Sequence, residues 1–241
     1  MGLHTVQRAV VTLLAPLWLP LAAGYLRFGA RYRVADLQEL RCEFDRIRSE
    51  TRGPLLLCSN HLTLIDSFLI LWALRSPWKL ITDWDSFAWN TPERTNFAGS
   101  PLHGVLTYLA KCIPITRGGR REDTGSVLKR VAYLLSRREL ALIFPEGGRS
   151  RSGRVEPENA AWGVGRIVGS VPNCRVLCIY LRGDAQETWG NFPEHGDTLR
   201  LKLACIEPKS DLRGARRSRD LARQITAQLV QMETEYFDGR Q

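Results

Sequence analysis

Several signatures of common protein classes are missing from this 241-residue sequence. No repeat, low-complexity run or Gly/Ser/Pro-rich linker divides residues 34–241, and the G-x-S-x-G elbow of serine hydrolases does not occur. The six cysteines are scattered without the paired spacing of a zinc ribbon or a disulfide framework. We therefore expect one domain over residues 34–241, with reduced cysteines and no structural metal.

Lysine is scarce, yet the chain is basic. Only five of the 34 basic residues are Lys, and 25 acidic residues leave a net charge of +9. This charge predicts an anionic partner, which is a nucleic acid, a membrane surface or a phosphorylated substrate. A cluster over residues 209–223 holds six basic and two acidic residues, but no recognised nucleic-acid module accompanies it. We expect no nucleic-acid partner. A non-enzymatic protein that binds acidic membranes or nucleic acid stays open as an alternative.

Long uncharged hydrophobic runs are absent, with one exception. Residues 9–26 (AVVTLLAPLWLPLAAGYL) carry no charge and have Arg residues on both sides. As a helix this run would reach ~27 Å, marginally short of the ~30 Å hydrocarbon core, and Pro16 and Pro20 would kink it. We predict that residues 1–33 attach to a membrane from one side rather than span it. A cleaved signal peptide and a buried first helix remain alternatives.

Apolar runs and helical patterns alternate after residue 33, which predicts an α/β fold. Strands are expected over residues 54–59, 112–116, 140–144, 175–181 and 199–206. Helices are expected over 66–74 and 124–136, and a last helix is expected to begin near Ser218 as its N-cap. Residues 83–104 are long, polar and aromatic, as in a substrate-facing lid. Trp84, Phe87 and Trp89 are therefore expected either to line an acyl groove or touch the membrane interface, or to pack in the core.

A histidine and an aspartate five positions apart follow the first of these strands, in the sequence NHLTLID (residues 60–66). On one continuous helix their side chains would lie ~140° apart, so His61 must sit in the turn before the helix. From there it can donate its Nδ1 proton to Asp66 in the first helical turn, which leaves Nε2 free as a general base. The alternative is a satisfied core histidine beside an unrelated aspartate.

Two further segments carry arginines beside glycines. FPEGGRS (residues 144–150) ends the strand predicted at 140–144, and CIPITRGG (residues 112–119) has the same order of strand, arginine and glycines. Adjacent glycines let backbone N–H groups turn toward an anion, and a guanidinium matches phosphate oxygens. Because ligands of α/β sheets bind at strand ends, these segments and the His-Asp pair predict one site.

Together, NHLTLID and FPEGGRS resemble the H-x4-D and F-P-E-G-x-R-S motifs of the glycerolipid acyltransferases, the lysophosphatidate acyltransferase family. CIPITRG resembles their intervening arginine motif, and the likeness covers roughly residues 55–180. The resemblance implies a mixed central sheet flanked by helices. It also implies transfer of a fatty acyl chain from acyl-CoA or acyl carrier protein to a lysophospholipid hydroxyl, without another cofactor or a metal.

By the same resemblance, His61 is the general base and Asp66 orients it. Arg117 and Arg149 are the phosphate-binding candidates, Glu146 and Gly147 shape the acceptor site, and Asn60 supports the histidine turn. The expected partners are membrane lipids and the acyl donor, and the expected location is the cytoplasmic face of a bacterial inner membrane. The oligomeric state is not predicted.

Three departures from the family pattern concern the acceptor. Gly148 replaces a frequent Thr, the usual Gly is missing at the step from Lys111 to Cys112, and residues 176–181 (VLCIYL) lack the usual Pro. Another lysophospholipid, an amino-acid lipid or a specialised fatty product therefore remains an alternative acceptor. A cysteine hydrolase that pairs Cys58 or Cys112 with His61 is a weaker alternative, because both thiols lie in apolar strands.

Overall fold

The computed structural model describes residues 2–94, 101–116 and 118–239. Its centre is a mixed β-sheet with the strand order β1-β6-β5-β2-β4-β3. The strands are β1 (Arg33–Val34), β2 (Leu55–Ser59), β3 (Trp89–Asn90), β4 (Ala141–Ile143), β5 (Arg175–Gly183) and β6 (Thr198–Ile206). Strands β3, β4, β2 and β5 are parallel, β6 is antiparallel to β5, and β1 is parallel to β6. The predicted α/β class with a mixed sheet is confirmed.

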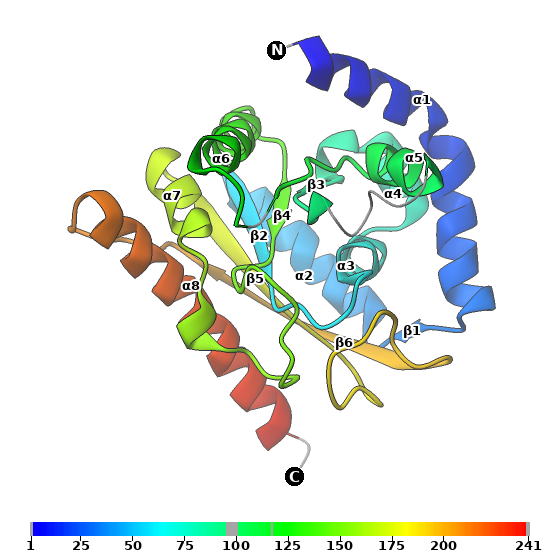
Figure 1. Ribbon diagram of the computed structural model, residues 1–241. Helices are drawn as coiled ribbons and strands as arrows, with labels where there is room; N and C mark the ends of the chain where they lie inside the picture. The colour runs from blue at the N-terminus through cyan, green and yellow to red at the C-terminus, as the bar shows by residue number, and fades with distance from the viewer. Residues whose placement is uncertain (1, 95–100, 117, 240–241) are drawn as a thin grey trace.

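Helices cover both faces of the sheet (Figure 1). They are α1 (Gly2–Gly24), α2 (Leu37–Glu50), α3 (Asp66–Leu74), α4 (Pro77–Thr82), α5 (Pro101–Leu109), α6 (Arg121–Ser136), α7 (Trp162–Ser170) and α8 (Gly214–Asp238). A short π-helix, Tyr25–Gly29, continues α1, and 3-10 turns occupy Trp84–Ser86 and Pro157–Asn159. In Figure 1, α1 and α3–α5 lie on the right of the sheet and α6–α8 on the left.

The side chains of the central strands alternate between two hydrophobic cores. Leu55 and Leu57 of β2 join a core formed with α1–α4, whereas Leu56 and Cys58 join a core formed with α6–α8. All five residues of β2 are buried, which matches a continuous apolar run in a strand covered on both faces. The alternation therefore places β2 in the middle layer of a three-layer sandwich, with helices on both sides. This packing determines the position of the carboxyl end of the strand.

The N-terminal helix has one face on the protein and one face outside it. Val11, Ala15 and Leu19 belong to the core shared with α2–α4, while Leu13 and Leu17 are 78% and 68% exposed. Residues 5–29 form a helical stretch long and apolar enough to cross a membrane, and 22% of its most hydrophobic window is buried. A lipid surface would cover the exposed apolar face of this helix. The exposed face therefore supports an association of the chain with a membrane. The extents of residues 1–33 and 34–241 as separate units stay predictions.

The structure corrects two expectations about the elements and decides a third. Helix α8 begins at Gly214 rather than near Ser218, and its N-cap residue is Arg213. Residues 112–116 form no strand, but two of them make isolated parallel bridges, Cys112 to Asn90 and Ile115 to Glu93. Of the two alternatives for residues 83–104, the core is the correct one for the described part before residue 95, because three aromatic side chains are buried: Trp84, Phe87 and Trp89. Residues 95–100 lie outside the described residues.

Candidate active site

The predicted site lies at the carboxyl edge of the parallel strands. The turn of residues 60–65 leaves β2, residues 144–150 leave β4, and residues 184–197 follow β5. Three backbone hydrogen bonds join these segments: Ser150 N donates to His61 O at 2.9 Å, Gly190 N to Leu62 O at 3.0 Å, and Leu64 N to Asn191 O at 3.1 Å. Segments far apart in the sequence therefore form one wall around the histidine turn.

His61 and Asp66 are in contact, as the sequence predicts. His61 Nδ1 lies 3.0 Å from Asp66 Oδ2, and Asp66 is the first residue of α3. Oδ2 also accepts the backbone N–H groups of Leu62 at 2.6 Å and Thr63 at 2.8 Å, and Oδ1 accepts the Thr63 hydroxyl. Four donors thus fix the carboxylate. Because the Asp66 carboxylate accepts a hydrogen bond from Nδ1–H, the free lone pair of the imidazole is assigned to Nε2. A general base needs such a lone pair to take a proton.

Asn60 holds the histidine turn to the neighbouring strand. Its Nδ2 donates to Leu181 O at 2.9 Å, and its Oδ1 accepts Leu181 N at 2.8 Å. The side-chain amide therefore replaces a strand residue and continues the pairing of β2 with β5 by one step. These two bonds fix the position of Asn60 at the start of the histidine turn, and its role in the reaction stays a prediction.

Glu146 lies beneath the histidine turn. Its Oε1 accepts the backbone N–H of His61 at 3.1 Å, whereas the buried Oε2 has no hydrogen-bond partner in the described part of the chain. Burial raises the pKa of this carboxyl to about 7, and the hydrogen bond from His61 lowers it by less. Gly147, at φ +67°, adopts a left-handed turn where a Cβ would meet the Ala161 Cβ at 3.3 Å.

Phe144 connects the histidine to a mostly apolar groove. Its ring stacks on the His61 imidazole with centroids 4.0 Å apart and planes 13° apart. Phe144 and Gly147 also line a cavity of about 320 Å³, together with Ile115, Thr116 and residues of α6 and α7. The cavity has the size and the apolar lining of a small-molecule or acyl-chain site.

Arg149 reaches over the site to the segment that follows β5. Its Nη1 donates to Gly190 O at 2.7 Å and to Asn191 Oδ1 at 2.9 Å, and its guanidinium carbon lies 4.9 Å from the centre of the Trp189 ring. Nε and Nη2 have no hydrogen-bond partner among the described residues. These contacts hold the cation at the rim and leave a fork of donors that suits a phosphate. Arg117 lies outside the described residues.

Sequence reasoning misses three contributors to this site. Thr63 binds both oxygens of Asp66, Ser150 donates its backbone N–H to His61, and residues 189–191 hold Arg149. The contact of Thr63 is local, because its hydroxyl and backbone N–H both reach a carboxylate only three residues further along the chain. The contacts of the segment 189–191 are not local, because they depend on where the loop after β5 returns.

The arrangement favours base catalysis by histidine over thiol chemistry. Burial raises the pKa of Cys112 to about 12 and raises that of Cys58 as well, so neither thiol forms a thiolate readily. All six cysteines are free. Over residues 2–94, 101–116 and 118–239, no group of three or more His, Cys, Asp or Glu side chains is arranged to hold a metal ion.

Two comparisons with known proteins agree with this geometry. A family model described as Acyltransferase matches residues 39–182, which is more than half of the chain. A curated 1-acyl-sn-glycerol-3-phosphate acyltransferase from Cocos nucifera is 34% identical over 110 residues, and the alignment covers 45% of this chain and 31% of that protein. The match thus spans about a third of the length of that relative.

Proposed function

Because the chain belongs to the acyltransferase family, we propose that it moves a fatty acyl chain from a thioester to the hydroxyl of a lysophosphatidate-like lysophospholipid. The observation that carries the proposal is the bond between His61 Nδ1 and Asp66 Oδ2, which leaves Nε2 as the nitrogen for a general base on a ring that stacks against Phe144 of the groove. The similarity to an enzyme named for 1-acyl-sn-glycerol-3-phosphate supports the class of acceptor. The donor is acyl-CoA or acyl carrier protein.

The proposed reaction is one direct displacement. Nε2 of His61 takes the proton of the acceptor hydroxyl while the oxygen attacks the thioester carbonyl carbon. The C–S bond then breaks, the thiolate leaves with its electron pair, and the proton held on Nε2 of His61 passes to the thiolate, which becomes the free thiol. The Asp66 carboxylate accepts from Nδ1–H throughout and stabilises the imidazolium that forms. A thioester is already activated, so a positioned base and aligned substrates suffice, and the proposed chemistry needs no further cofactor.

In this proposal the two arginines bind the phosphate of the acceptor, and the apolar groove binds the acyl chain. Arg149 supplies the donors for the acceptor phosphate, and Arg117 is its proposed partner. The cavity behind Phe144 takes the acyl chain, since its walls are mainly apolar. In this proposal α1 keeps the enzyme at the cytoplasmic face of a bacterial inner membrane, where a lysolipid acceptor resides.

The test is thiol release and lipid product formation when the detergent-purified chain is mixed with acyl-CoA and lysophosphatidate. We expect His61→Ala to reduce both by about 10² to 10⁴-fold, because the general base is lost. His195→Ala is the matched control, since His195 is exposed and bonds Gly29 O instead of a carboxylate. Cys112→Ala tests the thiol alternative and should retain activity.

Each other outcome has a distinct meaning. Release of thiol without an acylated lipid indicates a thioesterase, and release that survives His61→Ala contradicts the mechanism. Activity that appears only with an acyl carrier protein donor identifies that donor as the one the enzyme uses. Activity that appears only with a non-phosphate lipid acceptor contradicts the proposed class of acceptor. Salt-sensitive RNA binding in an inactive protein supports the non-enzymatic alternative.

A further inference from the structure

Lys111 occupies an unusual position just after helix α5. Its side chain is fully buried, and its φ of +51° lies in the left-handed region that favours glycine. Lys111 N donates to Tyr108 O at 3.3 Å and Cys112 N to Thr107 O at 3.1 Å, which is the bonding of a helix that ends in a left-handed residue. A lysine at this position therefore lowers the stability of the fold in two ways, through backbone strain and through burial of its charge. Other contacts must offset both.

The ammonium group of Lys111 is enclosed by aromatic rings and hydrogen-bond acceptors. Nζ lies 4.9 to 5.7 Å from the ring centres of Trp84, Phe87 and Trp89. It donates to Phe87 O at 2.7 Å and lies 3.4 Å from Glu139 Oε2. Burial lowers the pKa of Lys111 to about 8 although Glu139 opposes the shift, so the ammonium form persists at neutral pH.

Helix α1 contacts the same carboxylate that faces the Lys111 ammonium group. Arg8 Nη1 donates to Glu139 Oε1 at 3.1 Å, so one buried carboxylate joins the α1 cation to Lys111. Gln7 Nε2 donates to Tyr108 O at 3.1 Å and to Cys112 O at 3.4 Å, on both sides of Lys111. We call residues 108–112 the Lys111 turn. Gln7 and Arg8, together with Glu139 and the groups around the Lys111 ammonium, form a polar clamp that holds this turn.

The Lys111 turn leads directly into one wall of the groove. Asn90 N donates to Lys111 O at 3.0 Å, and Ile113 N donates to Asn90 O at 2.7 Å. The next residues, Ile115 and Thr116, line the cavity whose other wall contains Phe144 and Gly147. The position of that wall therefore depends on the turn that Gln7 and Arg8 hold.

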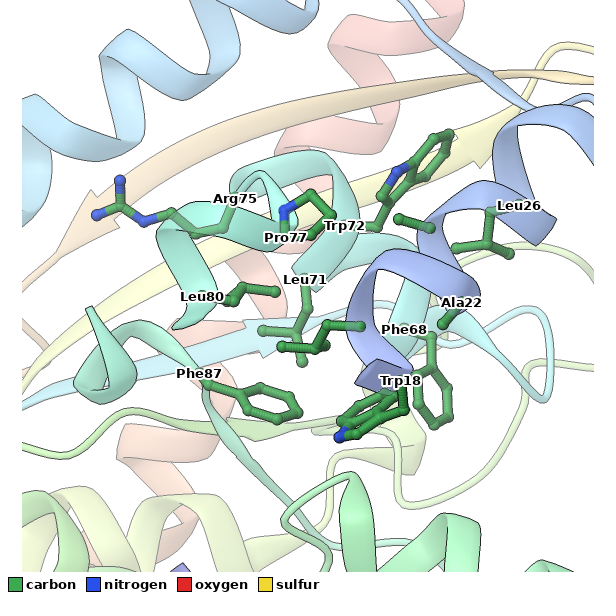
Figure 2. Close-up of a pocket in the computed structure, with 12 residues that line it drawn as sticks. Trp18, Ala22, Leu26, Phe68, Leu71, Trp72, Arg75, Pro77, Leu80 and Phe87 are labelled. Atoms are coloured by element: carbon green, nitrogen blue, oxygen red, sulfur yellow. The ribbon is translucent and has the colours of Figure 1, made fainter. Parts of the chain in front are cut away.

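We propose that α1, in addition to facing a membrane, positions the active-site groove, with Gln7 and Arg8 acting as positioning residues through Glu139 and the Lys111 turn. The inference rests on the proposed acyltransferase function. An apolar contact supports it. Trp18 and Ala22 of α1, and Leu26 of the π-helix that continues it, face Phe68, Leu71 and Leu80 of α3 and α4 (Figure 2). Helix α1 is therefore held in two places, by this apolar contact and by the polar clamp. Through the clamp, the position of α1 affects the position of residues 112–116.

The test compares the full chain with its Arg8→Ala and Gln7→Ala variants in detergent micelles. We expect the KM for lysophosphatidate or acyl-CoA to rise about tenfold with little change in kcat, because the groove wall loosens while the His61–Asp66 pair is untouched. Amide hydrogen exchange over residues 108–116 should become at least about tenfold faster. Arg8→Lys should restore much of both, since a cation again faces Glu139.

The matched control is Arg46→Ala, which removes an equally long cation from the exposed pair with Glu50 on α2. It should alter neither KM nor exchange. Lys111→Met combined with Arg8→Ala should show less than the sum of the single effects, because both cations act on Glu139. Unchanged KM and unchanged exchange in Arg8→Ala and Gln7→Ala overturn the inference. A wild type without transferase activity contradicts the proposed function instead, and the exchange experiment still decides whether the clamp exists.

Discussion

Two buried carboxyl groups sit beside His61 in opposite environments. Asp66 accepts four hydrogen bonds from a turn that wraps around it. Glu146 accepts one from the His61 backbone and leaves its second oxygen without a hydrogen bond among the described residues. The first arrangement suits a group that orients an imidazole, and the second suits a group that meets substrate or accepts a proton.

The raised pKa of Glu146 predicts how stability changes with pH. The folded carboxyl titrates near pH 7, above its usual value in an unfolded chain. Its contribution to folding is therefore fully present below pH 4.5 and is lost as the pH rises to about 7. Glu146→Gln removes this loss while keeping an acceptor for His61 N. We expect the variant to gain up to about 3 kcal/mol on the wild type between about pH 5 and pH 8.

Urea unfolding of both proteins at the two pH values measures this difference. Glu39→Gln is the control, because Glu39 is an exposed residue of α2 and is not among the groups that shift the Glu146 pKa. A stability difference between wild type and Glu146→Gln that is constant with pH would show that the carboxyl is not the titrating group.

Some site residues can be found from sequence because their contacts are local. His61 and Asp66 are five positions apart, so the turn geometry alone brings them together. Lys111 and Glu139 cannot be paired in this way. Their contact depends on α5, α6 and β4 packing together, and a lysine between apolar segments gives no signal of a buried cation. The sequence predicts Arg149 as a phosphate ligand, but its bonds to residues 190 and 191 follow from the return of the loop after β5.

At the scale of elements, the predicted strands of the sheet centre are confirmed because they are continuous apolar runs. Residues 55–59, 141–143 and 175–183 match the expected segments within three residues. The sequence does not predict helix α7, since WGVGRIVGS has three glycines in nine residues and a low helix propensity. It also places the start of α8 too late because Ser218 imitates an N-cap, whereas the helix extends back through a run of arginines.

Gly165 of α7 is explained by the close packing of this helix on α8. A Cβ at Gly165 would lie 1.8 Å from the backbone oxygen of Ser218, a contact that no rotamer can relieve. Gly165→Ala therefore has to push the two helices apart. We expect it to cost about 3 kcal/mol or more, measured as a lower midpoint in urea.

Gly125→Ala is the matched control for this variant. Gly125 lies in α6, and a Cβ at this position would meet no heavy atom within 4 Å, so alanine has room. Its higher helix propensity should stabilise the chain by up to about 1 kcal/mol. Equal effects of the two substitutions would contradict the proposed helix contact.

At the scale of the molecule, apolar and basic surfaces are separated. Helix α1, which carries exposed apolar side chains, lies on the right of Figure 1, whereas the arginine-rich start of α8 lies on the left. A membrane that contacts α1 therefore does not have to reach the basic cluster of residues 209–223. The net charge of +9 follows from composition, but only the fold shows that the two surfaces lie on different sides of the molecule (Figure 1).

The exposed face of α1 predicts how the chain binds lipid. Leu13, Leu17 and Leu21 are 68–78% exposed and follow one another at four-residue spacing, so they form one stripe. Each leucine buried in the acyl region contributes about 2 kcal/mol to binding. Leu17→Asp should therefore reduce cosedimentation with anionic phospholipid vesicles by at least about tenfold without lowering the midpoint of urea unfolding. Leu212→Asp is the control, because Leu212 is 48% exposed near the start of α8. Equal loss of binding in both variants would show that the basic side of the molecule also contacts the membrane, and unchanged binding in Leu17→Asp would exclude the α1 stripe as the attachment surface.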